Sequence, residues 1–220
     1  MFFKYLSRNT ITLVIATVVG IGSLSLVNFA LKSRIEDAQA NALRQTIVNL
    51  GQAFPTSNYD NDVSKSCYVP KEGAYDLADP KVNTLMLATK DGKITGYILI
   101  SSTWKGYEGL IRTMLVTDAQ GEIKAVRILQ QNETPGLGNK VITTDWVHSF
   151  DNLPLAQAKL PYLAVKKDGG QIDEFTGATI TPRAIVNQIR ENMQVVIADL
   201  VHNPQALQEK FVPCSVQGDQ

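Results

Sequence analysis

The longest apolar stretch of the chain lies near its N-terminus. Residues 9–31 contain no charged side chain. As an α-helix this stretch measures about 34 Å at 1.5 Å per residue, enough to cross a hydrocarbon core of about 30 Å. A cleaved signal peptide is the competing interpretation, because residues 38–40 (Ala-Gln-Ala) have the small side chains of a cleavage site, but its apolar core would span only about 7–15 residues. The pattern predicts a retained transmembrane helix at 9–31, after a short segment at 1–8.

Apolar residues continue at roughly helical spacing beyond this stretch, with charged residues between them. They are Ile35, Ala38, Ala42, Ile47 and Leu50. This spacing predicts an amphipathic helix over 33–50. We assign residues 32–52 to a helical stalk that leaves the membrane. The alternative, a helix packed on the following domain, stays open.

Four short apolar runs occupy the middle of the chain, at 81–89, 94–101, 110–117 and 123–129. Asp91-Gly92 separates the first two runs, and the turn sequence 118–121 separates the last two. An Asp-Gly pair between apolar runs is a strong hairpin signal. The pattern predicts an antiparallel meander of four strands, preceded by a loop at 54–80.

Helical spacing returns in the C-terminal half, where apolar residues step by three or four positions: Ile185, Ile189, Met193, Val196 and Leu200. With Thr181 as N-cap and Pro182 at the first helical position, this pattern predicts a helix over 182–200. A shorter helix is predicted at 138–150, and a short strand at 162–165 before a turn at 166–170. Strands followed by separate helices predict an α+β domain, which we place at 53–203, with a tail at 204–220.

Charged residues are balanced in number but not in position. Basic and acidic side chains each total 21. Residues 1–32 contain three basic side chains and no acidic one, so the rest of the chain has a net charge of about −3. A mildly acidic domain lacks the basic face that nucleic-acid binding requires. Two histidines and two cysteines, far apart in sequence, do not supply an ordinary four-ligand zinc site.

Two loops are candidates for a binding site. The first, 133–138 (ETPGLG), follows the fourth predicted strand and taken alone is a tight connector with exposed backbone N–H groups. The second, 173–179 (DEFTGAT), leads into the last predicted helix, whose N-terminus favours a phosphate group. An ordinary capping loop is the alternative. Neither a dinucleotide-binding fingerprint nor a P-loop motif is present.

Together the two loops resemble the FMN-binding domain family, in which the flavin is attached covalently to a threonine. The stretch 164–187, the segment 66–68 and the N-terminal anchor are similar to the G subunits of the Rnf ion-translocating electron-transport complex. The resemblance covers nearly the whole chain. The C subunit of the Na⁺-translocating NADH:quinone reductase shares the motif and the anchor and is an alternative assignment. A flavin-free extracytoplasmic assembly module is an alternative of a different class.

The resemblance implies a set of site residues. Thr179 would carry FMN through a phosphoester to its hydroxyl group, installed by a flavin transferase that uses FAD and recognises the motif including Asp173. The flavin ring or ribityl chain would contact the first loop, through Glu133, Thr134, Gly136 and Leu137. The phosphate end would be shaped by Thr176, Gly177 and Ala178. Lys166 either places a positive charge near the flavin or is a solvated turn residue.

The resemblance also implies a function and a location. The chain would be an electron-carrier subunit without independent catalysis, working with the other subunits of an ion-translocating complex. Positive charges flank the predicted span equally on both sides and leave its orientation open. The family places the N-terminus in the cytoplasm and the domain on the periplasmic side of the bacterial inner membrane. In that oxidising compartment Cys67 and Cys214 would form a disulfide; two free thiols are the alternative.

Overall fold

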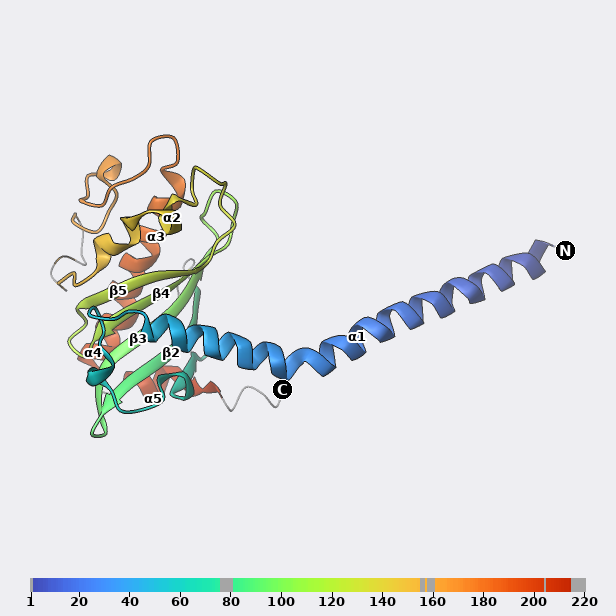
Figure 1. Ribbon diagram of the computed structural model, residues 1–220, viewed down its shortest axis with the longest axis horizontal. Coiled ribbons are helices and arrows are strands. Elements are labelled where there is room, and N and C mark those ends of the chain that lie inside the picture. The colour runs from blue at the N-terminus through green and yellow to red at the C-terminus, as the bar shows by residue number, and fades with distance from the viewer. Residues whose placement is uncertain (1, 76–80, 155–156, 158–160, 204, 215–220) are drawn as a thin grey trace. The chain divides into compact units, whose positions relative to one another are not determined.

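The structure is a computed structural model that describes residues 2–75, 81–154, 157, 161–203 and 205–214. The chain divides into two compact units, Met1–Thr46 and Ile47–Gln220. The first unit consists of the helix α1 (Phe2–Val48), which continues into the start of the second (Figure 1). No proline lies within α1, so every residue of this helix has a backbone N–H group.

Within α1, the segment Thr10–Lys32 is long and apolar enough to cross a membrane by length and composition. Polar side chains in this segment bond back to the helix: Thr17 Oγ1 donates to Leu13 O, and Ser23 Oγ donates to Gly20 O, both at 2.9 Å. Such internal partners lower the cost of hydroxyl groups in an apolar surrounding. The predicted span at 9–31 and the predicted helix at 33–50 are thus parts of one continuous helix.

The second unit contains a six-stranded antiparallel sheet in the order β5-β4-β3-β2-β1-β6. Its strands are β1 (Cys67–Pro70), β2 (Lys81–Lys90), β3 (Lys93–Thr103), β4 (Ile111–Asp118), β5 (Ile123–Gln130) and β6 (Phe211–Pro213). The predicted meander is confirmed as β2 to β5. In the β2–β3 hairpin Asp91 and Gly92 both have positive φ, +51° and +73°, as a two-residue turn of this kind requires.

The sheet is wider than the sequence pattern predicts. Strand β1 lies inside the predicted loop at 54–80, and β6 lies in the predicted tail. Both strands are short, and each is defined by its partner: Val69 pairs with Val212 at the edge of the sheet. Next to this pairing a disulfide joins Cys67 and Cys214, whose Cα atoms are 5.4 Å apart.

The predicted strand at 162–165 is wrong, because only Val165 forms a bridge, to Ile172. The surrounding backbone bonds locally, with Ile172 N donating to Ala164 O at 3.0 Å. The predicted turn that follows contains a short 3-10 helix, η5 (Lys166–Asp168).

The remaining helices are short, except for α3, which continues into the segment η6. They are η1 (Thr56–Asn58), η2 (Val63–Lys65), α2 (Lys140–Thr143), η3 (Asp145–Phe150), α3 (Ile180–Glu191), the π-helical segment η6 (Asn192–Ile197), α4 (Ala198–His202) and α5 (Ala206–Lys210). The predicted helix at 138–150 is split, because Thr144 adopts an extended conformation between α2 and η3.

The last long helix begins at Ile180, two residues before the predicted start. Its N-cap is Thr179 and not Thr181. The Thr181 hydroxyl donates to the Glu133 carboxylate instead of capping the helix. Pro182 is still tolerated, because it lies in the first turn, where backbone N–H groups have no partner within the helix.

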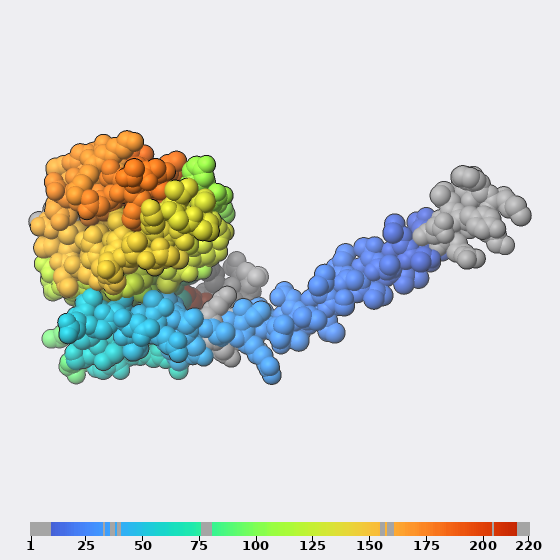
Figure 2. Space-filling view, turned by 45° about the horizontal axis from the view of Figure 1, so that its top comes forward, coloured from blue at the N-terminus to red at the C-terminus, as the bar shows by residue number. Residues whose placement is uncertain are grey.

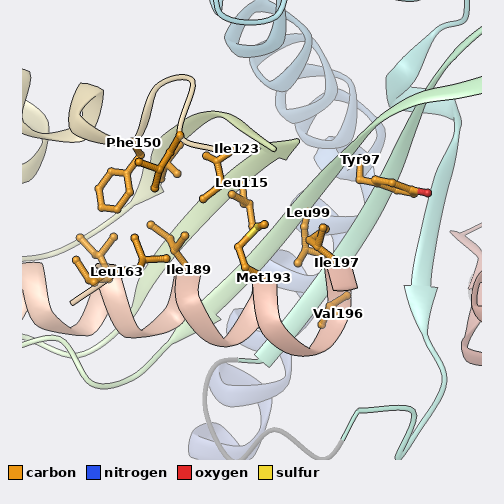
Figure 3. Close-up of a cluster of buried hydrophobic side chains, with 14 of the residues drawn as sticks. Tyr97, Leu99, Leu115, Ile123, Phe150, Leu163, Ile189, Met193, Val196 and Ile197 are labelled. Atoms are coloured by element: carbon orange, nitrogen blue, oxygen red, sulfur yellow. The ribbon is translucent and has the colours of Figure 1, made fainter. Parts of the chain in front are cut away.

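The core lies between one face of the sheet and the helix formed by α3 and η6. Figure 3 shows Ile189 and Met193 directed from this helix towards Leu115 and Ile123 on β4 and β5. The apolar face predicted from the sequence is buried throughout: Ile185, Ile189, Met193, Val196 and Leu200. On the other face of the sheet, Phe54 lies so close to Gly96 that a Cβ there would be 2.9 Å from its ring.

Candidate functional site

The two loops singled out from the sequence meet in one pocket of about 370 Å³. It lies at the end of the domain where the β3–β4 loop, the β5–α2 loop and the start of α3 come together (Figure 1). In Figure 2 these three segments, bright green, yellow and orange, lie side by side on the surface. The pocket is lined by Tyr107, Glu108, Glu133, Thr134, Leu137, Gly138, Gly177, Ala178, Thr179, Ile180 and Thr181.

Thr179 lies at the wall of this pocket, immediately before α3. Its backbone carbonyl accepts the hydrogen bond of Arg183 N at 3.1 Å, while its side chain caps no backbone N–H group. The hydroxyl group is therefore not used by the helix that it precedes. The first N–H groups of an α-helix lack partners within the helix, and its N-terminus favours negative charge. A hydroxyl group in this position suits attachment of a phosphate.

The turn before Thr179 is closed by a hydrogen bond from Ala178 N to Phe175 O at 2.9 Å. Gly177 adopts a φ of +80°, a conformation that side chains disfavour. Gly177 and Ala178 line the pocket, whereas Thr176 is exposed outside it. The turn thus directs the small residues Gly177 and Ala178 to the pocket and the Thr176 hydroxyl group to solvent.

Asp173 and Lys166 do not line the pocket. They form an ion pair at 2.5 Å on the surface, where the Asp173 side chain is 73% exposed. The hydrogen bond and the charge of Asp173 raise the pKa of Lys166. The backbone carbonyl of Asp173 accepts a hydrogen bond from Trp146 Nε1 at 2.6 Å, which fastens this end of the motif to η3.

The first loop enters the pocket with only part of its residues. Glu133, Thr134 and Leu137 line it, but Gly136 does not. Gly136 has a φ of +78° and donates its N–H to Asn139 Oδ1 at 2.7 Å, so its role is to form the turn.

Glu133 is buried, with 4% of its surface exposed. Its Oε1 accepts from Glu108 N at 3.1 Å, and its Oε2 accepts from the Thr181 hydroxyl. Both carboxylate oxygens are thus bound by the protein itself. Glu133 contributes to the pocket chiefly by connecting its walls.

Five lining residues lie outside the predicted set: Tyr107, Glu108, Gly138, Ile180 and Thr181. The Tyr107 side chain is 66% exposed beside the pocket. Leu137 and Ile180, which also line the pocket, have exposed apolar side chains as well. The nearest sequence signal is the run 104–109, where aromatic residues alternate with glycine and charged residues. Glu108 Oε1 accepts from Thr134 Oγ1 at 3.0 Å, which links this loop to the first.

The basic side chain nearest to Thr179 in sequence is paired with a carboxylate outside the pocket. Arg183, in the first turn of α3, binds Asp168 through two hydrogen bonds of 2.5 and 2.8 Å. The Arg183 guanidinium lowers the pKa of Asp168. Among the described residues that line the pocket, two are carboxylates and none is basic. The helix N-terminus and backbone N–H groups are therefore the local attraction for an anion.

Comparison with known proteins places this region in a recognised domain. A model of the FMN-binding domain matches residues 106–194, which include both loops and the start of the last long helix. The G subunit of the ion-translocating oxidoreductase complex from Photorhabdus laumondii is 38% identical over 83% of this chain and 86% of its own length. The protein of the same name from Pasteurella multocida is 39% identical over 77% of this chain and 82% of its own length.

Solved structures similar to this chain are more distant. The crystal structure of Shewanella oneidensis NqrC is 19% identical, with a TM-score of 0.42 over 70% of this chain and 73% of that one. The C subunit of the Na⁺-translocating NADH-quinone reductase from Parabacteroides distasonis is also 19% identical, with a TM-score of 0.38 over 54% of this chain and 61% of that one. Both TM-scores are below 0.5, so the fold assignment rests on the chain's own elements.

Proposed function

We propose that this chain, which belongs to the family of G subunits of ion-translocating oxidoreductase complexes, is a membrane-anchored subunit that carries FMN and passes electrons within such a complex. The relatives at 38% and 39% identity favour this assignment over the C subunit of the NADH:quinone reductase, whose solved structures are 19% identical. The other subunits of the complex are its partners.

The observation that carries the proposal is the meeting of two distant loops around one threonine hydroxyl. Glu133, Thr134, Leu137 and Gly138 line the same pocket as residues 177–181, which lie more than 35 residues later in the sequence. The residues present fit FMN: small residues leave space beside the backbone, apolar side chains of Leu137 and Ile180 suit a flat ring, and α3 directs its N-terminus at the phosphate end.

We propose further that FMN is bound covalently, through a phosphoester to Thr179. Support comes from the position of this residue, which directly precedes α3 and whose hydroxyl caps no N–H group. A cofactor outside the cytoplasm is lost by dilution unless it is tethered, and a covalent bond fixes its local concentration. Attachment through phosphate leaves the ring free. When bound, the ring supplies the redox chemistry, and the protein supplies position, solvent exclusion and electrostatics.

Attachment requires a flavin transferase, and the motif divides in a way that suits recognition by one. Asp173 and Thr176 are exposed to solvent, whereas Gly177, Ala178 and Thr179 line the pocket. The outward residues are available to the transferase and the inward residues to FMN. Recognition of Asp173 would replace its ion pair with Lys166, an exchange that costs little because both side chains are solvated.

We place the domain on the periplasmic side of the inner membrane, with the residues before the span in the cytoplasm. The disulfide between Cys67 and Cys214 supports this, because disulfides persist in oxidising compartments. A domain in the cytoplasm would keep both thiols reduced.

The test is covalent flavin on the full chain co-expressed with a flavin transferase. Wild-type protein is expected to fluoresce as a flavin band on a denaturing gel and to gain the mass of one esterified FMN. Thr179→Val removes the hydroxyl and is expected to lose both signals. Thr143→Val, a matched change on the exposed surface of α2, keeps them. Wild-type protein that stays colourless would support the flavin-free assembly module instead.

A further inference from the structure

We infer that Glu133 is a positioning residue that holds the Thr179 segment and the 106–108 segment in register before FMN is attached. The inference rests on the proposed function and adds a residue through which the acceptor hydroxyl is placed. Three observations carry it: the contacts of the carboxylate, the space left for it, and the location of its partners.

The carboxylate of Glu133 connects two segments that are far from it in sequence. Glu108 N, 25 residues earlier, donates to Oε1, and Thr181 Oγ1, 48 residues later, donates to Oε2. Among the described residues, no basic side chain forms an ion pair with it. A buried carboxyl group is costly unless its oxygens are hydrogen-bonded. Because both bonds here come from segments distant in sequence, the group ties those segments together.

The backbone around the carboxylate leaves room for it. A Cβ atom at Gly106 would lie 2.6 Å from Glu133 Oε1, and one at Gly138 would lie 2.6 Å from Oε2. Side-chain carbons do not approach oxygen so closely. Both positions therefore favour glycine; Gly106 lies in the segment of Glu108, and Gly138 lies in the loop of Glu133 itself.

Both partners of Glu133, Glu108 and Thr181, line the pocket. Thr181 lies two residues after Thr179, in the same first turn of α3, and is buried. Further along the same helix, the buried amides of Gln188 and Asn192 donate to Ser101 Oγ at 2.8 and 2.6 Å. Ser101 therefore fixes the middle of the helix and Glu133 fixes its beginning, where the acceptor hydroxyl lies.

Because both oxygens are bound by the protein, Glu133 acts through the segments that it connects and not by touching FMN. Two consequences distinguish this role from a direct one. Removal of Thr181's hydroxyl and removal of the carboxylate break the same bond, so their effects are not additive. Glu133→Gln keeps the shape and one acceptor for Glu108 N, and its amide can donate to the Thr181 oxygen, so it restores most of the function.

The experiment measures transfer of flavin from FAD to the purified full chain, made without FMN, by a purified flavin transferase. Glu133→Ala and Thr181→Val are expected to lower kcat by on the order of tenfold, since small misplacement of a reacting group is costly. The double variant is no slower than the slower single one, and Glu133→Gln stays within about threefold of wild type. Gln188→Ala is the matched control, a buried polar truncation on the same helix away from the pocket; it leaves kcat unchanged.

Hydrogen exchange on the FMN-free chain gives a readout that needs no flavin. Glu133→Ala and Thr181→Val are expected to speed exchange at the amides of Glu108 and Arg183, which have hydrogen-bond partners in wild type, whereas Gln188→Ala leaves both amides protected. The inference is overturned if Glu133→Ala and Gln188→Ala lower kcat equally, if Glu133→Gln is as slow as Glu133→Ala, or if exchange at the two segments does not change. If Glu133→Ala does not fold, the test rests on the other two variants: the inference is overturned if Thr181→Val has the kcat of wild type or if Glu133→Gln is as slow as Thr181→Val. Wild-type protein that accepts no flavin would refute the proposed function, which is a different outcome.

Discussion

The helix formed by α3 and η6 is held by different interactions at its two ends. Beyond Ile185, apolar side chains bury against the sheet, as Figure 3 shows for Ile189 and Met193. At its first turn, polar groups take over: Thr181 binds Glu133, and Arg183 binds Asp168. Apolar burial is non-directional, so the first region provides stability. Hydrogen bonds depend on direction, so the second provides geometry.

This difference explains why the pocket lies at the first turn and not along the helix. A well-packed core has no space for a ligand, and its side chains sit at a density close to that of organic crystals. The first turn leaves backbone N–H groups without partners and faces loops that contain Gly138 and Gly177. Changes in the core and at the sheet edge should therefore alter stability, and changes at the pocket should alter flavin attachment.

The largest expected effect on stability comes from the disulfide, at the sheet edge opposite β5. Replacing Cys67 and Cys214 by serine opens a loop of 147 residues, and on the chain-entropy model this lowers the free energy of unfolding by about 4–5 kcal/mol. Urea unfolding of the full chain in detergent, with and without reductant, measures it. The double variant should have the same free energy of unfolding as reduced wild type, and adding reductant should not change it. Identical curves for wild type with and without reductant would show that the two thiols are not bridged.

A truncation in the core is the next largest effect. Leu115 on β4 is fully buried and lies against the helix in Figure 3. Leu115→Ala leaves a cavity and is expected to lower the free energy of unfolding by about 2–5 kcal/mol. The amount of covalent flavin per folded molecule should stay that of wild type, because the pocket is untouched. Loss of flavin in proportion to stability would remove the distinction between the two regions.

Local patterns in the sequence predict the parts of this fold that local chemistry determines. Asp91-Gly92 predicts its hairpin because few other residues accept positive φ at both positions, and the spacing from Ile185 to Leu200 predicts a buried helix face. The strands β1 and β6 are not predicted, because strands of four and three residues are too short to show alternation and are defined by their pairing partners.

The pocket shows the same limit. The loops at 133–138 and 173–179 are recognised through their resemblance to a family. The β3–β4 loop is not, because its place in the site depends on contacts with residues distant in sequence, from Glu108 N to Glu133 and from Thr134 to Glu108. The start of α3 is misplaced for a similar reason. Thr181 before Pro182 is a standard N-cap sequence, and only the distant Glu133 shows that its hydroxyl is used elsewhere.

A smaller effect is expected from the ion pair at the first turn of α3. Arg183 lowers the pKa of Asp168, and a carboxyl group whose pKa is lower in the folded state stabilises the fold above its unfolded pKa of about 3.9. This contribution is lost as the pH falls below about 4. Because the pair is solvated, it is worth about 0.2–1 kcal/mol. Urea unfolding between pH 6 and pH 3 should therefore be slightly less pH-dependent in Asp168→Asn; equal slopes would contradict the pairing.

The smallest effect on stability is expected at Tyr107, and it is the sharpest test of the comparison. Its side chain is 66% exposed at the pocket, so Tyr107→Ala should change the free energy of unfolding by no more than about 0.5 kcal/mol. If the flavin ring stacks on Tyr107, the phenol ring quenches its emission, and the flavin of the variant should then fluoresce more strongly than that of wild type. Ile142→Ala, an exposed apolar residue that does not line this pocket, is the matched control and should change neither quantity. Equal flavin emission from wild type and both variants would show that the flavin ring lies away from the 104–109 loop. The cofactor would then be held only by the first turn of α3 and the 133–138 loop.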